Sequence, residues 1–377
     1  MTNYKSLQPK PARILVIAMR YLGDLLLTTP LLHSLRQAYP DAQLDILVLR
    51  NATGMLEGNP DIDHVITTPT SAKFADHWHL LRQIFRRYDF AIATQTGDRP
   101  FLYALFAAPL RIAVVPPKNT SGHWKRFFVQ RWTEFDNNNT HTVLQHLNLL
   151  DLIDIPRYFS LIPPKPDDIK QLTKQFSFLS GDGSYAVLHP YPQWTYKQWT
   201  IEGWVEIGYY LNKLGLKLVF SGGPAQEEQE YVANIVCKLP ENTINLAGQV
   251  SLAQLAAIIA QAKLFIGPDT GITHLAAATG IPVIALYGPT NPVKWAPWPS
   301  GFNQNKNPFQ KIGCQRINNI VLCQGQADCV PCHLEGCDRH RKSRSQCLDR
   351  LSPELVKELI KQVLGYPQKT DENKSAF

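Results

Sequence analysis

The hydrophobic pattern opens with two short apolar runs separated by a loop and a longer apolar stretch. Residues 13–18 and 44–49 each form a mostly apolar run of the kind found in a strand buried on both faces. Between the two runs, a loop holding Gly23 leads into an apolar helix predicted over 24–38. A strand, a helix and a second strand in this order predict parallel strands joined by a right-handed crossover.

The rest of the first half continues the alternation more weakly. We expect strands at 65–66 and 90–94 and helices over 77–87 and 141–151. The proline-rich stretch 162–166 predicts a stiff, extended segment. We therefore place the first domain at residues 1–165.

The second half restarts the same pattern. The predicted strands are 185–189, 216–220, 264–266 and 283–287, and the predicted helices are 201–214, 227–238, 251–262 with Ser251 as its cap, and one beginning near Gly271. Strands alternating with helices favour a doubly wound α/β domain, here at residues 166–350. After Pro299 the regularity fails, and we expect a Cys-rich loop over 314–347. A C-terminal part at 351–377 holds a last helix over 353–364 and a polar tail predicted to be disordered.

Length and charge narrow the class of protein. A chain of 377 residues with 44% hydrophobic content has enough apolar material for two domains. No run of about 20 uncharged apolar residues appears, so we expect a soluble, cytoplasmic protein. The net charge of +7 fits an anionic ligand or an anionic membrane surface. Basic residues are scattered and show no helix-turn-helix pattern, so nucleic acid is not an expected partner.

The loop at 267–274 follows a predicted strand and opens a helix. Ligands of open α/β sheets bind at the carboxyl ends of strands, and a helix N-terminus suits a diphosphate. Gly271 lets the backbone come close to a ligand, Thr270 adds a hydroxyl, and Asp269 could order the loop or bond a sugar hydroxyl. The alternative is a capped turn that binds nothing, which has similar residue chemistry.

Two further loops of the second half carry candidate donor residues. Gly222 and Gly223 follow a predicted strand and permit close approach of a ribose or a flat ring, and Glu227 or Glu228 could accept the ribose hydroxyls. An ordinary turn is the alternative. Lys197 lies between two tryptophans, where its ammonium could stabilise the charge of a leaving diphosphate.

The first loop of the chain carries a candidate base. Asp24 follows Gly23, where a carboxylate could take a proton from an attacking hydroxyl. The alternative is that Asp24 is only the N-cap of its helix. These candidates together fit one reaction, in which the second half holds a sugar nucleotide and the first half holds the acceptor and a base.

Several of these motifs resemble one family. The residues at 13–17 and 23–30, with Leu35-Arg36 and Tyr39-Pro40 behind them, resemble the opening of glycosyltransferase family 9, the lipopolysaccharide heptosyltransferases. Residues 267–271, 274–277 and 287–290 resemble the donor-site signature of that family. The stretch from His189 to Trp199 and the late cysteines look most like the heptosyltransferase III type.

The resemblance implies a fold and a reaction. The fold would be GT-B, an α/β architecture of two Rossmann-like domains that face each other across a cleft. The reaction would transfer L-glycero-D-manno-heptose from an ADP-heptose donor to the inner core of lipopolysaccharide, with inversion of the anomeric centre. No metal-ligand set is evident around the residues of this chemistry, so we expect that catalysis requires no metal or other cofactor.

The resemblance also implies roles for single residues. Asp24 would be the general base and Lys197 a diphosphate contact. The donor phosphates and sugar would meet Asp269, Thr270, Gly271 and His274, and the adenosine would meet Gly222, Gly223 and either Glu227 or Glu228. The hydroxyl-bearing residues that some members place before the lysine have no clear counterpart, since Pro192, Gln193 and Trp194 stand there.

Basic residues of the first half are candidates for contact with the acceptor. We single out Arg99 and Arg126, with Gly23, as acceptor-binding. The core oligosaccharide carries carboxylates and phosphates, and the inner membrane offers a leaflet of anionic lipid, so peripheral contact with its cytoplasmic face is expected. A solvated basic surface is the alternative. The whole set is Arg82, Arg86, Arg87, Arg99, Arg111, Lys125 and Arg126.

Six of the seven cysteines fall in one late segment. Cys329, Cys332, Cys337 and Cys347 offer thiolates at spacings that could close on structural zinc or iron, and Cys314 and Cys323 are further candidates. Buried thiols or a disulfide formed under stress are the alternatives.

Three other functions compete with heptosyl transfer to lipopolysaccharide. The nearest is a GT-B enzyme with another nucleotide-sugar or a protein acceptor. The second is a binding module without activity, against which the joint presence of Asp24, Lys197 and Asp269 argues. The third is a nicotinamide-dependent oxidoreductase, which is disfavoured because no G-x-G-x-x-G motif follows the first strand.

Overall fold

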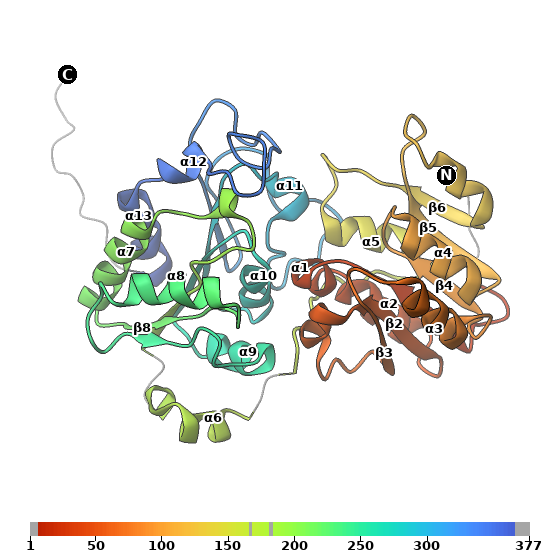
Figure 1. Ribbon diagram of the computed structural model, residues 1–377, viewed down its shortest axis with the longest axis horizontal. Helices are drawn as coiled ribbons and strands as arrows, with labels where there is room; N and C mark the ends of the chain where they lie inside the picture. The colour runs from red at the N-terminus through yellow and green to blue at the C-terminus, as the bar shows by residue number, and fades with distance from the viewer. Residues whose placement is uncertain (1–6, 166–167, 181–183, 366–377) are drawn as a thin grey trace. The chain divides into compact units, whose positions relative to one another are not determined.

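The computed structural model describes residues 7–165, 168–180 and 184–365 (Figure 1). The predicted disordered tail, from residue 366 onward, and the end of the predicted extended segment at 166 lie outside the described residues. Among the described helices, none is long and apolar enough to cross a membrane.

The chain divides into two compact units, each with its own sheet. Unit 1 comprises Met1–Asp168, Ser251–Ala257 and Val293–Gln310, and unit 2 comprises Ile169–Val250, Ile258–Pro292 and Lys311–Phe377. Two short segments from the second half of the sequence, Ser251–Ala257 and Val293–Gln310, therefore belong to unit 1. The contiguous domain boundaries predicted from the sequence remain a prediction.

The sheet of unit 1 is parallel and has the strand order β3-β2-β1-β4-β5-β6. This is the Rossmann order, in which the chain reverses its direction of winding beside the first strand. The strands are β1 Arg13–Ile17, β2 Gln43–Leu49, β3 His64–Thr68, β4 Phe90–Ala93, β5 Leu110–Val115 and β6 Arg131–Glu134. The βαβ prediction for the start of the chain is confirmed.

The helix predicted over 24–38 is two helices. Pro30 has no N–H to donate to the carbonyl of Leu26, and the hydroxyl of Thr29 donates to that carbonyl instead, at 2.8 Å. The chain therefore breaks after a short first helix. The helices of unit 1 are α1 Leu22–Leu26, α2 Thr29–Ala38, α3 Phe74–Ile84, α4 Asp98–Ala107 and α5 Thr142–Asp151, with 3-10 turns η1 Arg50–Leu56 and η2 His123–Phe128.

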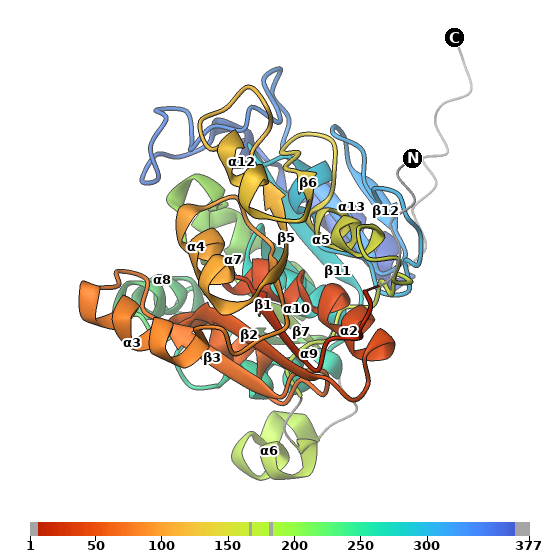
Figure 2. The ribbon, with the colours of Figure 1, turned by 90° about the vertical axis from the view of Figure 1, so that its right-hand side faces the viewer.

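Helix α4 was not predicted, because it carries apolar residues on nearly every side and so lacks a clear helical period. It lies beside α3, as Figure 2 shows.

The sheet of unit 2 repeats the Rossmann order and adds an edge hairpin. Its strand order is β12-β13-β11-β10-β7-β8-β9, and among the described strands only β12 and β13 pair antiparallel. The strands are β7 Tyr185–Leu188, β8 Lys217–Phe220, β9 Ile244–Asn245, β10 Leu264–Pro268, β11 Val283–Tyr287, β12 Gln315–Ile317 and β13 Ile320–Gln324. The expectation that regularity fails after Pro299 was wrong for this hairpin, which turns at Asn318 with φ 48°.

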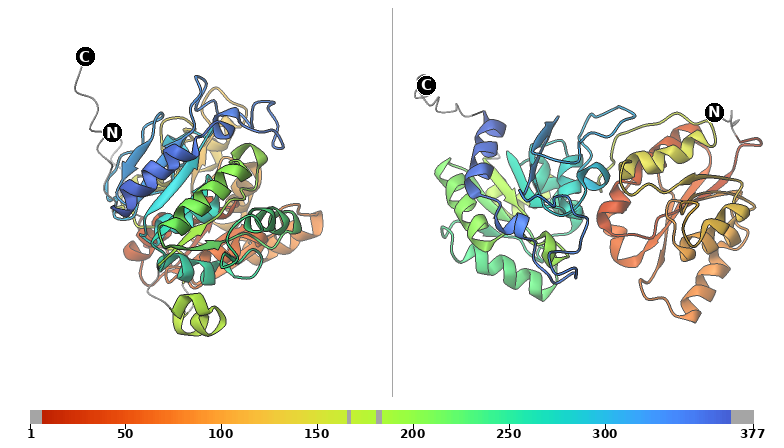
Figure 3. Two further views of the ribbon diagram at one scale, coloured as in Figure 1. Left: turned by 90° about the vertical axis from the view of Figure 1, so that its left-hand side faces the viewer. Right: turned by 90° about the horizontal axis from the view of Figure 1, so that it is seen from above.

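Helices α7 Ile201–Lys213, α8 Gln226–Val236 and α13 Pro353–Leu364 lie side by side on one face of this sheet (Figure 3). The other helical segments of unit 2 are α6 Ile169–Gln175, η3 Ser177–Ser180, η4 Thr195–Lys197, α10 Gly271–Ala278 and α12 Gln346–Asp349. Helices α9 Leu252–Ala260 and α11 Pro292–Trp295 contain residues of both units.

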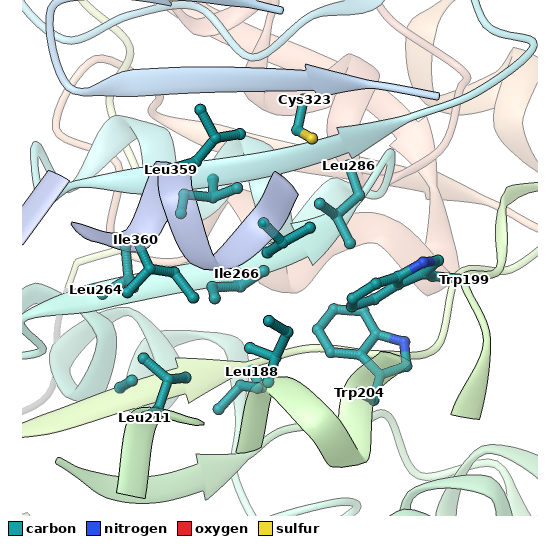
Figure 4. Packing of buried hydrophobic residues seen from close by; sticks show 14 of the residues in the cluster. Leu188, Trp199, Trp204, Leu211, Leu264, Ile266, Leu286, Cys323, Leu359 and Ile360 are labelled. Atoms are coloured by element: carbon teal, nitrogen blue, oxygen red, sulfur yellow. The ribbon is translucent and has the colours of Figure 1, made fainter. Parts of the chain in front are cut away.

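Two tryptophans fix the segment that leads from β7 into α7 (Figure 4). Trp199 and Trp204 are fully buried, and their rings meet edge to face at 5.3 Å between centroids. The indole N–H of Trp199 donates to the carbonyl of Leu351 at 2.9 Å, while the buried Nε1 of Trp204 has no hydrogen-bond partner among the described residues. Burial of each ring contributes on the order of 2–3 kcal/mol. The loop just before Trp199 is therefore held firmly at one end.

Candidate active site

The loop after β10 is built as predicted, with a capped helix at its end. Thr270 is the N-cap of α10, and its hydroxyl accepts the N–H of Thr273 at 3.3 Å. Thr273 is buried and donates its own hydroxyl to the carbonyl of Pro268. The backbone of the loop is therefore fixed, and the first N–H groups of α10 face its N-terminal end, where an anion is stabilised.

Asp269 and Lys197 form an ion pair in this loop. The Lys197 ammonium lies 2.6 Å from Oδ2 of Asp269, and the hydroxyl of Tyr287 donates to Oδ1 at 3.3 Å. Lys197 ends η4 after β7, and β7 is the sheet neighbour of β10. The two residues were predicted separately as donor-site candidates, and the structure brings them together.

Electrostatics fix the charge states of this group. Burial by itself raises the pKa of Asp269, but the charge of Lys197 together with contributions from His274 and Thr290 lowers it overall. The carboxylate is therefore charged near neutral pH. Burial raises the pKa of Tyr287 well above its ordinary range, and the Asp269 charge adds to that effect, so this hydroxyl keeps its proton.

His274 is buried inside α10 and is held neutral. Burial lowers the pKa of its imidazole to about 4, which the charge of Asp269 opposes. Its Nδ1 has no hydrogen-bond partner among the described residues. A buried ring nitrogen without a partner costs free energy, which a ligand hydroxyl or phosphate oxygen could recover.

The glycine pair after β8 lies under an acidic side chain. A Cβ on Gly223 would come within 2.7 Å of a Glu228 carboxylate oxygen. Burial raises the pKa of Glu228, and a hydrogen bond from the Gly223 N–H opposes the rise. Glu227 is exposed and hydrogen-bonds to Tyr191, whose pKa is raised to about 12 by burial and by that bond. Glu228, rather than Glu227, is the acid packed on the two glycines.

Asp24 is placed in the first turn of α1 in unit 1. The N-cap of that helix is Tyr21, so the alternative role of Asp24 as a cap does not apply. Gly23 is the preceding residue of the same turn and accepts the N–H of Leu27 at 3.0 Å. The Asp24 carbonyl accepts the hydroxyl of Thr28 at 2.8 Å, which ties the turn to the start of α2. The carboxylate is half-buried.

A buried lysine near Asp24 was not predicted. Lys294 is almost completely buried, and its ammonium donates to the carbonyl of Asp136 at 2.7 Å and lies 4.6 Å from the ring centre of Phe135. Burial lowers its pKa to about 8, while the charges of Asp136 and Asp24 raise it. The only signal in the sequence is a lysine between apolar residues late in the chain, which does not reveal that it packs with unit 1.

A buried histidine completes this group. His146 lies within 3.3 Å of the Thr28 hydroxyl. Burial lowers its pKa to about 4, and the positive charges of Lys294 and Arg20 add to that effect. His146 is therefore neutral. The cation whose charge acts with that of Asp24 is Lys294 and not this imidazole.

The two predicted acceptor-binding arginines are engaged within unit 1. Arg99 donates to the carbonyls of Thr70 and Pro69 at 2.8 and 3.1 Å. Arg126 donates to the carbonyl of His123 at 2.9 Å and lies 3.6 Å from Glu134. Both guanidinium groups order loops of the unit, and their proposed contact with an acceptor remains a prediction.

The Cys-rich loop does not assemble the predicted ligand set. Within residues 7–165, 168–180 and 184–365, no group of three or more His, Cys, Asp or Glu side chains is arranged to hold a metal ion. Cys329, Cys332 and Cys337 are near enough for their charges to add to burial in raising the pKa of the Cys347 thiol to about 11. The four sulfurs share a region of the loop without forming a coordination shell.

The same loop supports the turn that carries Lys197. The Arg341 guanidinium lies 4.5 Å from the ring centre of Trp194, and the Arg341 carbonyl accepts the N–H of Thr195 at 3.1 Å. The Ser345 hydroxyl donates to the carbonyl of Tyr196 at 2.7 Å. The Cys-rich loop therefore braces the candidate active site, a role that its sequence does not reveal.

With this geometry in place, comparison with known proteins gives the class. The model of glycosyltransferase family 9 (heptosyltransferase) matches residues 77–324, which is more than half of the chain. Lipopolysaccharide heptosyltransferase 3 of Escherichia coli is 28% identical over 295 residues, covering 76% of this chain and 86% of that protein. The chain therefore belongs to glycosyltransferase family 9, and it is an enzyme of the heptosyltransferase class.

Solved structures agree on the fold. A family 9 glycosyltransferase from Veillonella parvula superimposes with a TM-score of 0.76 at 21% identity, over 97% of this chain and 100% of that chain. The E. coli ADP-heptose lps heptosyltransferase II superimposes with a TM-score of 0.69 at 21% identity, over 93% and 98% of the two chains. The predicted GT-B architecture of two Rossmann-like domains is confirmed.

Proposed function

We propose that the chain transfers heptose from ADP-L-glycero-D-manno-heptose to the inner core of lipopolysaccharide, with inversion at the anomeric carbon. The observation that carries the donor assignment is the Lys197–Asp269 pair at 2.6 Å beside the N-terminus of α10. A cation and free helix N–H groups together suit a diphosphate. The names of its relatives, a lipopolysaccharide heptosyltransferase and an ADP-heptose lps heptosyltransferase, support the substrate pair.

The donor residues act on the leaving group. As the bond from the anomeric carbon to the diphosphate oxygen breaks, negative charge grows on ADP. Lys197 and the first N–H groups of α10 stabilise that charge, and Thr270 keeps the helix terminus in place. The Nδ1 of His274, which has no hydrogen-bond partner among the described residues, accepts a sugar hydroxyl. Gly222, Gly223 and Glu228 receive the adenosine, with Glu228 accepting ribose hydroxyls.

Asp24 acts on the acceptor. Its carboxylate takes the proton of the acceptor hydroxyl as that oxygen attacks the anomeric carbon from the face opposite ADP. One displacement of this kind inverts the configuration. The charge of Asp24 raises the pKa of Lys294, so a cation near the carboxylate accompanies this step. No step needs a metal, because Lys197 and α10 supply the positive charge.

The first test is calorimetry of the purified chain with ADP and ADP-heptose, against UDP, GDP and NAD. Selective binding of ADP that weakens in Lys197→Ala, but not in the exposed control Lys238→Ala, supports the donor assignment. A preference for UDP would overturn the assignment of the donor and, with it, that of the acceptor. It would not affect the fold.

The second test concerns the base. Asp24→Ala should bind ADP-heptose as the wild type does and lose turnover by about a thousandfold, the size expected for removal of a general base. Turnover at the wild-type rate would overturn the assignment. Stereochemistry is read directly from the product by NMR of the new anomeric proton.

We further propose that the enzyme works on the cytoplasmic side of the inner membrane and binds its face peripherally, where a lipid-linked acceptor is presented. A structural metal at the Cys-rich loop stays a prediction from the cysteine spacing. Metal content of the purified chain, measured before and after dialysis against a chelator, tests it separately from turnover.

A further inference from the structure

One surface of unit 1 exposes an unusual number of large apolar side chains. Of the fifteen large hydrophobic residues that are exposed in the described parts of the chain, nine fall between residues 74 and 132, and Phe74 and Phe127 are 84% and 77% exposed. We call these nine the aromatic face: Phe74, Trp78, Phe85, Leu102, Phe106, Trp124, Phe127, Phe128 and Trp132. Clusters of this kind on a globular unit mark an interaction surface.

The aromatic face draws on α3, α4, η2 and β6, and several of its rings are linked by contacts. On α3, Phe74 and Trp78 are one turn apart and share a side of the helix. Phe85, just after α3, meets Phe106 of α4 with ring centres 6.4 Å apart. The other end of α4 is reached through the buried ring of Phe101, which packs edge to face on Trp124 at 5.5 Å and on Phe128 at 6.4 Å, both from η2. Figure 2 shows α3 and α4 together on this side of unit 1.

The same segment holds the whole positive excess of the chain. Residues 73–132 contain ten Lys and Arg and three Asp, a net of 10 − 3 = +7, which equals the formal charge of the full sequence. The other residues are therefore neutral in sum. Lys125 is buried in an ion pair with Asp98, but Lys73, Arg82, Arg86, Arg87 and Lys118 are exposed.

Basic and aromatic groups are interleaved on the face. The guanidinium of Arg82 lies 5.2 Å from the ring centre of Trp78, and that of Arg86 lies 5.8 Å from the ring centre of Phe85. Arg126 lies 5.8 Å from the ring centre of Trp132. Cations held over exposed rings place positive charge and apolar surface at the same level, which matches the headgroup layer of a bilayer.

We infer that the aromatic face and its basic residues dock unit 1 on the surface of an anionic phospholipid bilayer. The rings would enter the boundary between headgroups and acyl chains, and the exposed Lys and Arg side chains would bind lipid phosphates. A second copy of this chain is a poor occupant, because two faces of the same positive charge repel each other. The inference names the surface behind the proposed membrane location, and it rests on that part of the proposed function.

The binding test uses vesicles of phosphatidylglycerol and phosphatidylcholine in equal parts, against vesicles of phosphatidylcholine alone, in co-sedimentation. The wild type should bind the anionic vesicles and release them in 0.5 M NaCl, since salt screens exposed charges. Trp78→Ser/Phe127→Ser and Arg82→Glu/Arg86→Glu should each bind at least about tenfold more weakly. The matched control is Tyr209→Ser/Ile312→Ser, which removes two exposed apolar side chains from unit 2 and should bind as the wild type does.

Three results would overturn the inference. The first is a wild type that does not bind anionic vesicles, and the second is a pair of variants that bind them unchanged. The third combines two measurements. In sedimentation velocity the wild type would self-associate and Trp78→Ser/Phe127→Ser would not, while both proteins bound vesicles equally. The occupant of the aromatic face would then be a second copy of this chain.

An activity assay separates this inference from the proposed transfer reaction. Trp78→Ser/Phe127→Ser should turn over a soluble, deacylated acceptor at the wild-type rate and a vesicle-embedded acceptor more slowly. If the wild type used neither acceptor, the proposed reaction would fail while the vesicle-binding result still decided the docking surface. Equal slowing on both acceptors would place the two aromatic residues in acceptor recognition and overturn the docking role.

Discussion

Lys197 lies 2.6 Å from Asp269, and each depends on the other for its place. The carboxylate is buried, so it needs a cation, and the hydroxyl of Tyr287 holds its second oxygen. The lysine, in return, is held at the terminus of α10 without a ligand. A donor diphosphate would therefore meet a cation that is already positioned, which lowers the cost of ordering it.

Removing one partner of this pair should cost more stability than removing both. Lys197→Met leaves a buried carboxylate without its cation, which is expected to cost about 3–5 kcal/mol in the free energy of unfolding. Lys197→Met/Asp269→Asn should recover a large part of that loss and stay inactive. Urea unfolding of the wild type, both single variants and the double variant measures the coupling. Additive losses would show that the two side chains do not interact.

Asp269 should also make the stability of the protein depend on pH in the acidic range. Its pKa in the folded protein is lowered by Lys197 below the value of an unfolded chain, which is about 4. The contribution of this carboxylate is thus present above pH 4 and is lost as the pH falls through the lower, folded pKa. The melting temperature of the wild type should fall below pH 4 more steeply than that of Asp269→Asn. Parallel curves for the two proteins would contradict the shift.

Lys294 should also make stability rise with pH, but in the alkaline range. Burial lowers its pKa to about 8 in the folded protein, against about 10.4 in an unfolded chain. Between these values the unfolded state binds more protons, so the stability that Lys294 contributes rises with pH. The melting temperature of the wild type relative to Lys294→Met should increase from pH 7.5 to 10. If the difference in melting temperature between the wild type and Lys294→Met stayed constant over this range, the pKa of Lys294 would not be lowered.

Cys314 should be the most reactive thiol of the chain. A hydrogen bond from the Cys323 thiol lowers the pKa of Cys314 to about 6, against the opposing effect of burial, and Cys314 is partly exposed. Its alkylation by iodoacetamide should level off above about pH 7, because a thiolate is the reacting form. Cys323→Ala should move this plateau to higher pH. Peptide mapping by mass spectrometry gives the rate, with exposed Cys237 as the reference thiol.

The local pattern of the sequence was enough for most of the framework. Apolar runs such as 13–17 and 283–287 must be buried on both faces, so they predict parallel strands wherever they stand in the chain. Caps such as Ser251, whose hydroxyl accepts the N–H of Gln254 at 3.1 Å, act over a few residues and were equally readable. The helix break at Pro30 and the β12–β13 hairpin were missed, since short elements carry too few residues to show a period.

The order of strands decided what the local pattern could not. Sequence placed Lys197 and Asp269 each at the end of a strand, but only the pairing of β7 with β10 makes them neighbours. In the same way, Lys294 joins the group near Asp24 only because its segment packs with unit 1. A sequence determines which residues are buried through their own chemistry. Contacts between distant residues depend on how the elements pack, because two charges attract each other strongly only when packing holds them within a few ångströms.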